Sequence, residues 1–301
     1  MKPARQPLDG VLLLNKPVGI TSNAALQKAK WLLNAKKAGH TGTLDPFADG
    51  LLPLCFGEAT KFSAYLLDAD KHYRAVQRLG VTTTTGDPEG EVLSHAEVHA
   101  SCADLAAVLP RFVGEIEQIP PMHSALTHQG RPLYEYARAG IEIDRPPRKV
   151  TIRSLDMVEC APPRVVLDVQ CSAGTYIRTL AQDIGAALGC GAHLTALTRL
   201  GSGGFKLKQA HSLAELEALD PGQRSGLLLP ADCLVAHLPA VQLDAADAEA
   251  LCQGRSVAHP AADPGLTRVY AAPHHFIGLA DVNDGRLIPR RLIATQRVKV
   301  T

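Results

Sequence analysis

The sequence predicts an α+β fold in which strands and helices are mixed along the chain. Segments with strand-like and helix-like apolar spacing follow one another, and most are joined by short turns. With 301 residues and 46% hydrophobic residues, the chain can bury the core of one large domain, alone or with a small appended unit. No repeat at a solenoid period is present, which excludes a stacked-repeat architecture.

The first predicted elements are a short strand and a helix. Residues 11–14 are apolar and lead into a turn at 16–19, where Lys, Pro and Gly occur together. Thr21 or Ser22 can cap the helix that follows. The buried face of this helix is predicted to carry four apolar side chains: Ala25, Ala29, Leu32 and Leu33.

The central part of the chain predicts a strand, a helix and an excursion from the core. Residues 71–81 (KHYRAVQRLGV) alternate imperfectly between apolar and polar, which is typical of a strand. Residues 82–91 are rich in turn-forming types, and 105–113 predict a helix. Between 119 and 153, Pro, Arg and Tyr replace most aliphatic residues, so this stretch is expected to leave the core.

The C-terminal part begins with the strongest local signals. Residues 165–172 predict a strand, and 175–189 (TYIRTLAQDIGAALG) predict a helix that Gly189 terminates. The residues after 250 read as short strands, with Asn283-Asp284-Gly285 as a hairpin turn. The predicted buried face of the helix consists of Ile177, Leu180, Ile184 and Leu188.

Charge is balanced overall but unevenly distributed. The formal net charge is +1, so no global field indicates a nucleic-acid partner. Residues 1–40 hold seven basic side chains against Asp9 alone, residues 212–250 are acidic, and the chain after Asp284 is basic, with Arg297 and Lys299 near its end. The two basic ends could face a polyanion while the acidic segment points elsewhere, or all three could be ordinary solvated charge.

The cysteines and the hydropathy predict a cytoplasmic protein without metal. The seven cysteines include no C-x-x-C pair, which is typical of free, buried thiols in a reducing compartment. Cys190 and His193 could form half of a metal site, but no second pair follows at zinc spacing. The N-terminus lacks an apolar signal region, and the hydrophobic stretch 227–243 is broken by Pro230 and Asp232, so neither export nor a membrane span is expected.

One carboxylate has unusual surroundings. In AGHTGTLDPFADGLLP (38–53), Asp45 lies between a Gly/Thr-rich run and a proline, and wholly apolar residues follow Gly50. A solvated turn would be more polar, so the region around Asp45 is expected to be kept dry. Asp49 could supply a second carboxylate for a hydrolase, but it is better explained as a turn-former.

Other catalytic motifs are absent. No Walker A sequence and no G-x-S-x-G elbow occur. The segments GSGGFK (201–206) and GCGAHL (189–194) each miss the third glycine of a dinucleotide fingerprint, and both are interpreted as turns.

Several segments together resemble one family, the bacterial tRNA pseudouridine-55 synthases of the TruB type. The resemblance covers nearly the whole chain and implies a mixed, mainly antiparallel pseudouridine-synthase sheet flanked by helices, with a small C-terminal PUA-like β-barrel. The segments that carry it are LNKPVGITS, GHTGTLDPFADGLLP, KHYRAVQRLG, IPPMHSALTHQGRPLYEYARAG, GTYIRTLAQDIG, CGAHLTALTRLGSGGF and GRLIPRRLIAT.

The resemblance implies isomerisation of uridine in the TΨC arm of tRNA. The bond from uracil N1 to C1′ breaks, the ring turns, and C5 is joined to C1′. A single carboxylate suits this chemistry, because it can trap positive character at C1′ and an isomerase must keep water out. Asp45 is then the essential residue, as a nucleophile at C1′ or as a base that removes a sugar proton.

The resemblance also assigns five substrate-binding residues, and each has a structural alternative. Arg178 is the expected partner of the carboxylate, since a buried carboxylate needs one. Tyr73 is expected to stack on the flipped uracil and could serve in proton transfer at C5. Tyr176 is expected to contact the substrate, Leu197 to line the uracil pocket, and His40 to contact nucleotides displaced from the loop. The alternatives are a surface Arg, packed tyrosines, a core Leu and a structural His.

The implied domain organisation is a catalytic domain at 1–238 and a PUA-like RNA-binding domain at 239–301. Residues 119–153 resemble a segment that closes over the RNA arm, where arginines such as Arg138 are available for phosphates. No metal, organic cofactor, guide RNA or obligatory protein partner is implied, and a monomer is expected. Two other functions stay open: an RNA-binding or RNA-folding protein, and a synthase with a different or guided RNA target.

Overall fold

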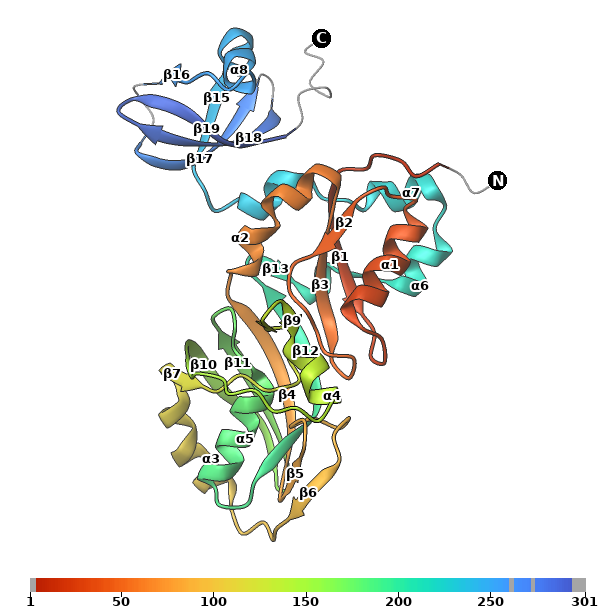
Figure 1. Ribbon diagram of the computed structural model, residues 1–301, viewed down its shortest axis with the longest axis vertical. Helices are drawn as coiled ribbons and strands as arrows, with labels where there is room; N and C mark the ends of the chain where they lie inside the picture. The colour runs from red at the N-terminus through yellow and green to blue at the C-terminus, as the bar shows by residue number, and fades with distance from the viewer. Residues whose placement is uncertain (1–3, 260–262, 272–273, 294–301) are drawn as a thin grey trace.

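Most strands of the protein form one large mixed sheet (Figure 1). The computed structural model describes residues 4–259, 263–271 and 274–293. Neighbouring strands are antiparallel except for two parallel pairs, β1–β14 and β3–β12, so the predicted mixed, mainly antiparallel sheet is confirmed. The order is β14 (His211–Ser212), β1 (Gly10–Lys16), β3 (Asp49–Phe56), β12 (Ala192–Ser202), β4 (Lys71–Leu79), β11 (Arg164–Cys171), β10 (Arg148–Ala161) and β7 (Gly114–Gln118), with β2 (Ala38–His40) on β3 and β13 (Phe205–Lys206) on β12.

Two helices pack their apolar faces into the core of this sheet. They are α1 (Ser22–Leu32) and α5 (Ile177–Ala187). The predicted faces are confirmed, except that Leu188 is only half-buried. Thr21 is the N-cap of α1, because its side chain accepts a hydrogen bond from Ala24 N. The other helices are α2 (Ser63–Leu67), α3 (Cys102–Val108), α4 (Leu133–Arg138), α6 (Leu213–Ala218), α7 (Pro221–Gly226) and α8 (Ala245–Cys252), with short 3-10 helices η1 (Gly57–Phe62), η2 (Leu109–Phe112), η3 (Leu207–Gln209) and η4 (Ala231–Val235).

The helix predicted at 105–113 begins and ends earlier than expected. Ser101 and Asp104 form a capping box that starts α3 at Cys102. Pro110 cannot donate a backbone hydrogen bond, so the α-helix stops at Val108 and the chain continues as η2.

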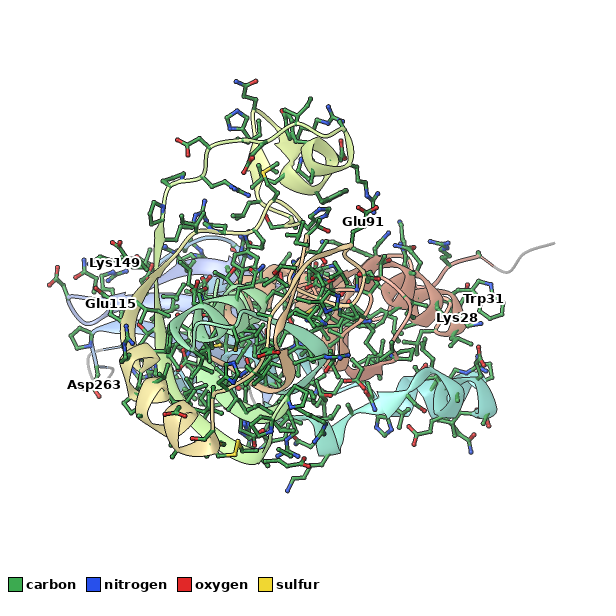
Figure 2. The ribbon with its side chains drawn as sticks, turned by 90° about the horizontal axis from the view of Figure 1, so that it is seen from below. Lys28, Trp31, Glu91, Glu115, Lys149 and Asp263 are labelled. Carbon is green, nitrogen blue, oxygen red and sulfur yellow. A yellow bond between two sulfur atoms is a disulfide. The ribbon has the colours of Figure 1, made fainter. Side chains whose placement is uncertain are left out.

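Residues 119–147 leave the sheet between β7 and β10, and we call this segment the insertion. It contains α4 and the two-residue strands β8 (Thr127–His128) and β9 (Arg131–Pro132), whereas residues 148–153 of the predicted excursion belong to β10. Seen from below, the insertion stands out from the rest of the protein (Figure 2). Glu115 and Lys149, which form a 2.8 Å ion pair between β7 and β10, lie near its base.

A second, five-stranded sheet follows in the order β15 (Ala240–Leu243), β17 (Gly265–Ala271), β18 (His275–Asn283), β19 (Arg286–Leu292) and β16 (Val257–Ala258). It curls around its own hydrophobic core together with α8, as expected for a small PUA-like unit. Asp284 and Gly285 have φ values of 48° and 69° and connect β18 to β19, which confirms the predicted hairpin turn. Arg297 and Lys299 lie outside the described residues, as does the end of GRLIPRRLIAT.

The second sheet contacts the 3-10 helices η1 and η4 through aromatic and polar side chains. The rings of Phe62 and Phe276 are 5.3 Å apart, and the Tyr270 hydroxyl donates to Asp232 at 2.7 Å. In the N-terminal part of the fold, Lys28 on α1 forms a 2.6 Å ion pair with Glu217 on α6. Part of the acidic segment therefore packs against the basic N-terminal helix and does not point elsewhere.

The expectation that all cysteines are free is wrong for one pair. Cys102 and Cys160 form a disulfide between the start of α3 and the end of β10. They are 58 residues apart in sequence, so no local pattern shows their proximity. Cys55, Cys171 and Cys190 are free and buried. Within the described residues, no helix is long and apolar enough to cross a membrane.

Candidate active site

Asp45 lies in the loop between β2 and β3, and a side chain from α1 holds this loop in place. The Ser22 hydroxyl donates to Leu44 O at 2.9 Å and accepts from Leu44 N at 2.8 Å, which ties the loop to the start of α1. Leu44 is buried, as are Leu51 and Leu52 in β3. The apolar run after Gly50 thus packs beneath the loop, and the side chain of Asp45 keeps 34% exposure.

Arg178, the second residue of α5, brings four segments together. Its side chain is 5% exposed. Its Nε lies 3.1 Å from Asp45, and its Nη1 lies 3.3 Å from Asp87. The guanidinium also donates to Thr85 O at 3.1 Å and to His123 O at 2.6 Å. The predicted pairing of Arg178 with the carboxylate is therefore present, and four polar partners surround the buried cation.

The pKa of Asp45 reflects two opposing effects. Burial raises this pKa above its ordinary value of 3.8, and the Arg178 guanidinium opposes the rise by stabilising the anion. Asp87 nearby adds a repulsive contribution that raises the pKa further. The site thus holds a poorly solvated carboxylate next to one fixed cation, which suits a nucleophile.

Asp87 is a site residue that the sequence analysis missed. Its side chain is 3% exposed, and its carboxylate accepts hydrogen bonds from the Thr85 hydroxyl and from Glu89 N in addition to its pairing with Arg178. Because these contacts engage both carboxylate oxygens, Asp87 is poorly placed to activate a water molecule. The available signal was the run TTTTGDPEG, in which four threonines precede a single Asp.

Lys16 is buried below the Asp45 loop. It is 0% exposed, and its Nζ donates to Pro17 O at 2.9 Å and Ile20 O at 2.8 Å. Burial lowers its pKa to about 8, against the attraction of Asp49 and Asp45. Asp49 begins β3 and has a buried Oδ1 without a hydrogen-bond partner. Lys16 therefore holds the 17–20 turn, whose Gly19 N donates to Pro46 O at 2.8 Å, and it adds positive potential near Asp45.

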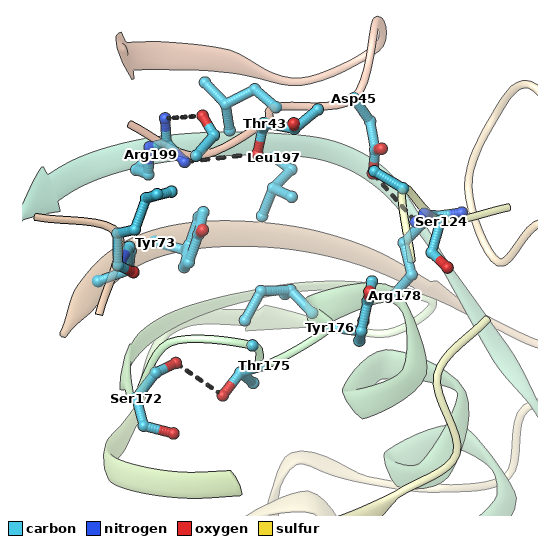
Figure 3. A pocket seen from close by; sticks show the side chains of 17 residues that line it. Thr43, Asp45, Tyr73, Ser124, Ser172, Thr175, Tyr176, Arg178, Leu197 and Arg199 are labelled. Carbon is cyan, nitrogen blue, oxygen red and sulfur yellow. Dashed lines mark hydrogen bonds and ion pairs between the residues drawn. The ribbon is translucent and has the colours of Figure 1, made fainter. Parts of the chain in front are cut away.

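A cavity of about 270 Å³ opens beside Asp45 and Arg178. Tyr73 from β4, Leu197 from β12 and Tyr176 from the start of α5 line it (Figure 3). Burial raises the pKa of the Tyr73 phenol, so this phenol is neutral near pH 7. The cavity is of a size that admits one pyrimidine base, with an aromatic ring available for stacking.

Arg199 also lines this cavity and was not predicted. It is 1% exposed, and its guanidinium donates to Leu51 O at 2.7 Å and Gly42 O at 3.2 Å, on either side of Asp45. Its backbone packs against Gly50, whose φ is 100°, and a Cβ there would lie 2.4 Å from Arg199 O. Gly50 is thus required by the close approach of β12 to the end of the loop.

His40 lies apart from the first cavity. It lines a neighbouring cavity of about 720 Å³, which also reaches Asp45 and Arg178 and is bounded by Tyr134 and Arg138 of the insertion. Burial, and then Arg199, lower the pKa of His40, so its imidazole is neutral at pH 7. The structure therefore brings Asp45, Tyr73, Tyr176, Arg178 and Leu197 together in one cavity and places His40 in the adjoining one.

Family models cover most of the chain. Residues 30–177 match the TruB family pseudouridylate synthase N-terminal domain, 178–236 match the tRNA pseudouridylate synthase B C-terminal domain, and 239–293 match the C-terminal domain of pseudouridine synthase II TruB.

Known proteins of high similarity have matching names. The chain is 76% identical over 295 residues to tRNA pseudouridine synthase B of Thiobacillus denitrificans, covering 98% of this chain and 99% of that protein. It is 56% identical over 296 residues to tRNA pseudouridine synthase B of Chromobacterium violaceum, covering 97% of each chain. A solved Cbf5-Nop10-Gar1 complex contains a chain that is 29% identical, with a TM-score of 0.70, over 93% of this chain and 80% of that one.

The fold, the cavity with its single ion-paired carboxylate, and these similarities define a pseudouridine synthase, which is an isomerase. The chain belongs to the TruB family of pseudouridylate synthases.

Proposed function

We propose that the protein converts uridine 55 in the TΨC arm of tRNA into pseudouridine, with Asp45 as the catalytic residue. The observation that carries the proposal is the pairing of Asp45 with buried Arg178 at 3.1 Å, at the edge of a cavity of base size. The names of the relatives, tRNA pseudouridine synthase B, support tRNA as the substrate.

The proposed reaction uses Asp45 at C1′ of the flipped nucleotide. Its carboxylate attacks C1′ as the bond to uracil N1 breaks, the uracil turns within the cavity, and C5 bonds to C1′ as the carboxylate leaves. The proton at C5 is then lost and N1 takes up a proton, so the product is an isomer of the substrate. Removal of a sugar proton by Asp45 is the alternative first step, and it also requires the ionised carboxylate.

The neighbouring side chains have supporting roles in this proposal. Tyr73 stacks on the extruded uracil, and this stacking offsets part of the cost of unstacking the base from the RNA. Its phenol is also available for proton transfer at C5. Leu197 and Tyr176 bound the base, Arg178 holds Asp45, and neutral His40 contacts nucleotides displaced into the larger cavity.

The proposed division of labour places catalysis in residues 1–238 and additional RNA contact in 239–301. The insertion closes over the RNA arm, with Arg138 and other basic side chains on phosphates. We propose that the protein works in the cytoplasm as a monomer, without cofactor, metal, guide RNA or protein partner. This single chain covers 99% and 97% of the lengths of the two relatives named above.

Mapping of the modified nucleotide tests the position. An unmodified tRNA transcript is incubated with the protein, treated with a carbodiimide that forms a stable adduct with pseudouridine, and read by primer extension. The proposal predicts one enzyme-dependent stop, adjacent to nucleotide 55. Stops at other uridines with none at 55 would assign a different target, and a parallel assay with added RNA extract would reveal a guided enzyme.

A further inference from the structure

Gln118 is a buried polar side chain close to the site but outside the cavity. It is the last residue of β7 and is 2% exposed. Its amide makes two hydrogen bonds to one residue: Oε1 accepts from Tyr176 N at 3.0 Å, and Nε2 donates to Tyr176 O at 3.3 Å. Gln118 therefore binds both main-chain polar groups of Tyr176.

Tyr176 depends on this contact because α5 has no capping side chain of its own. Tyr176 is the N-cap of α5, in an extended conformation with φ −98° and ψ 107°, and it makes no side-chain cap hydrogen bond. The first turn of a helix leaves donors without intrahelical partners, so its geometry is set by whatever binds there. Here the ring of Tyr176 lines the cavity, and Arg178 follows two residues later.

The position of Gln118 also joins this helix start to the insertion. Gln118 pairs with Arg148 where β7 ends and β10 begins, so the insertion starts at the residue after Gln118. Within the insertion, His123 O accepts the hydrogen bond from Arg178 at 2.6 Å. The start of α5 is thus bonded to Gln118, just before the insertion, through Tyr176 and to His123, within the insertion, through Arg178.

We infer that Gln118 is a positioning residue for catalysis: its amide fixes Tyr176 and, through the first turn of α5, the Arg178 guanidinium that holds Asp45. This inference rests on the proposed function, in which these groups act on uridine. Gln118 touches no substrate, so its loss lowers the rate of the chemical step and leaves RNA affinity nearly unchanged.

Two near-isosteric variants test the inference. In Gln118→Glu, the ionised carboxylate can accept from Tyr176 N but cannot donate to Tyr176 O. When protonated, the carboxylic acid supplies one acceptor and one donor, as the amide does. Gln118→Met supplies neither at any pH. Gln170→Glu, which adds the same charge on the exposed face of β11, is the matched control.

The measurement is the single-turnover rate of pseudouridine formation at saturating enzyme, taken as the ratio of variant to wild type at each pH. At about pH 8, Gln118→Glu and Gln118→Met are expected to be at least about tenfold slower than wild type, because the first loses the hydrogen bond to Tyr176 O and the second loses both hydrogen bonds to Tyr176. On acidification the Gln118→Glu ratio rises toward one, whereas the Gln118→Met ratio stays low. The Gln170→Glu ratio stays near one, and the RNA dissociation constants of all variants stay within about twofold of wild type.

A wild-type rate for both variants at every pH would overturn the inference. So would an equal, pH-independent loss in both variants accompanied by weaker RNA binding, because that pattern indicates only a general structural role. If Gln118→Glu does not fold at about pH 8, Gln118→Met is the test: a slower rate with unchanged RNA affinity supports the inference, and a wild-type rate overturns it. The proposed function fails separately, if wild-type protein forms no pseudouridine in the same assay.

Discussion

Arg178 and Asp87 form a buried ion pair, with 3.3 Å between Nη1 and the carboxylate, while another nitrogen of the same guanidinium meets Asp45. The two carboxylates thus share one cation, and Asp87 is the more buried of them, with 3% side-chain exposure against 34% for Asp45. Asp87 therefore holds the guanidinium through Nη1, and Asp45, which lines the cavity, pairs with Nε.

Replacing Asp87 by Asn is expected to slow catalysis and to destabilise the fold. Arg178 would keep Asp45 and two carbonyls but lose its most buried anion, so we expect a loss of about 1–3 kcal/mol in the free energy of unfolding. The single-turnover rate should fall by about tenfold or more, since the orientation of Asp45 depends on Arg178. Denaturant unfolding and a rate measurement on unmodified tRNA check both.

Asp168→Asn is the control for this prediction. Its carboxylate pairs with Arg74 at 2.8 Å on the surface, where the Arg74 side chain is 46% exposed. An exposed pair of this kind contributes about 0.2–1 kcal/mol to the free energy of unfolding. Asp168→Asn should therefore change stability little and leave the rate unchanged. Equal effects at Asp168 and Asp87 would contradict the special role of the buried pair.

As the pH is lowered, the rate should be lost at a pH above the pKa of an ordinary Asp. Burial raises the pKa of Asp45 above 3.8, and both forms of the proposed mechanism need the ionised carboxylate. The rate is therefore full where Asp45 is ionised and is lost as the pH falls through the raised pKa. Single-turnover rates across the acidic range, with circular dichroism at each pH, measure this. A rate that stays constant down to an ordinary Asp pKa would show that Asp45 is not poorly solvated.

Substitutions of Tyr73 should separate stacking from proton transfer. Tyr73→Phe keeps the ring and should retain RNA affinity, but it removes the phenol that is available at C5 and should slow product formation. Tyr73→Leu removes the ring as well and should cost a further amount of about 1–3 kcal/mol, the value of base–aromatic stacking. Rates and dissociation constants of the two variants are compared, and full activity of Tyr73→Leu would exclude the stacking role.

Arg138 of the insertion should contribute to the salt dependence of RNA binding. Its guanidinium lies over the Tyr134 ring at 5.3 Å and borders the larger cavity. If it contacts one phosphate, Arg138→Gln should make the slope of log affinity against log salt shallower by about 0.7–0.9. Arg164→Gln is the control and should leave the slope unchanged. Arg164 is the first residue of β11 and forms a 2.7 Å ion pair with Glu159 of β10. Equal slopes for Arg138→Gln and wild type would place Arg138 away from the RNA.

Local signals in the sequence predicted the parts of the fold that local chemistry determines. The Thr21 cap, the strand at β11 and the Asp284-Gly285 hairpin each follow from neighbouring residues. The burial of Leu51 and Leu52 could be predicted as well, because they form an apolar run directly after Gly50, although the Asp45 side chain itself keeps 34% exposure.

Long-range contacts in the site could not be predicted from such signals. Arg178 is bonded to residues from three distant segments. The run TTTTGDPEG is the one local signal near Asp87, and His123 has none. Arg199 lies in a strand where a charged residue would ordinarily face solvent, yet it is buried because main-chain carbonyls of the Asp45 loop surround it. Tertiary partners, which no local pattern specifies, decide these positions.

The most direct test of the central claim is the release of tritium from unmodified tRNA labelled at C5 of its uridines, with wild type beside Asp45→Asn and without added metal or nucleotide. Formation of pseudouridine replaces the hydrogen at C5, so the account predicts about one equivalent of tritium per tRNA with wild type and none with Asp45→Asn, although both bind the RNA. Release by Asp45→Asn at the wild-type rate would contradict the role of Asp45. No release by wild type, with the transcript still bound, would leave an RNA-binding protein in place of the enzyme.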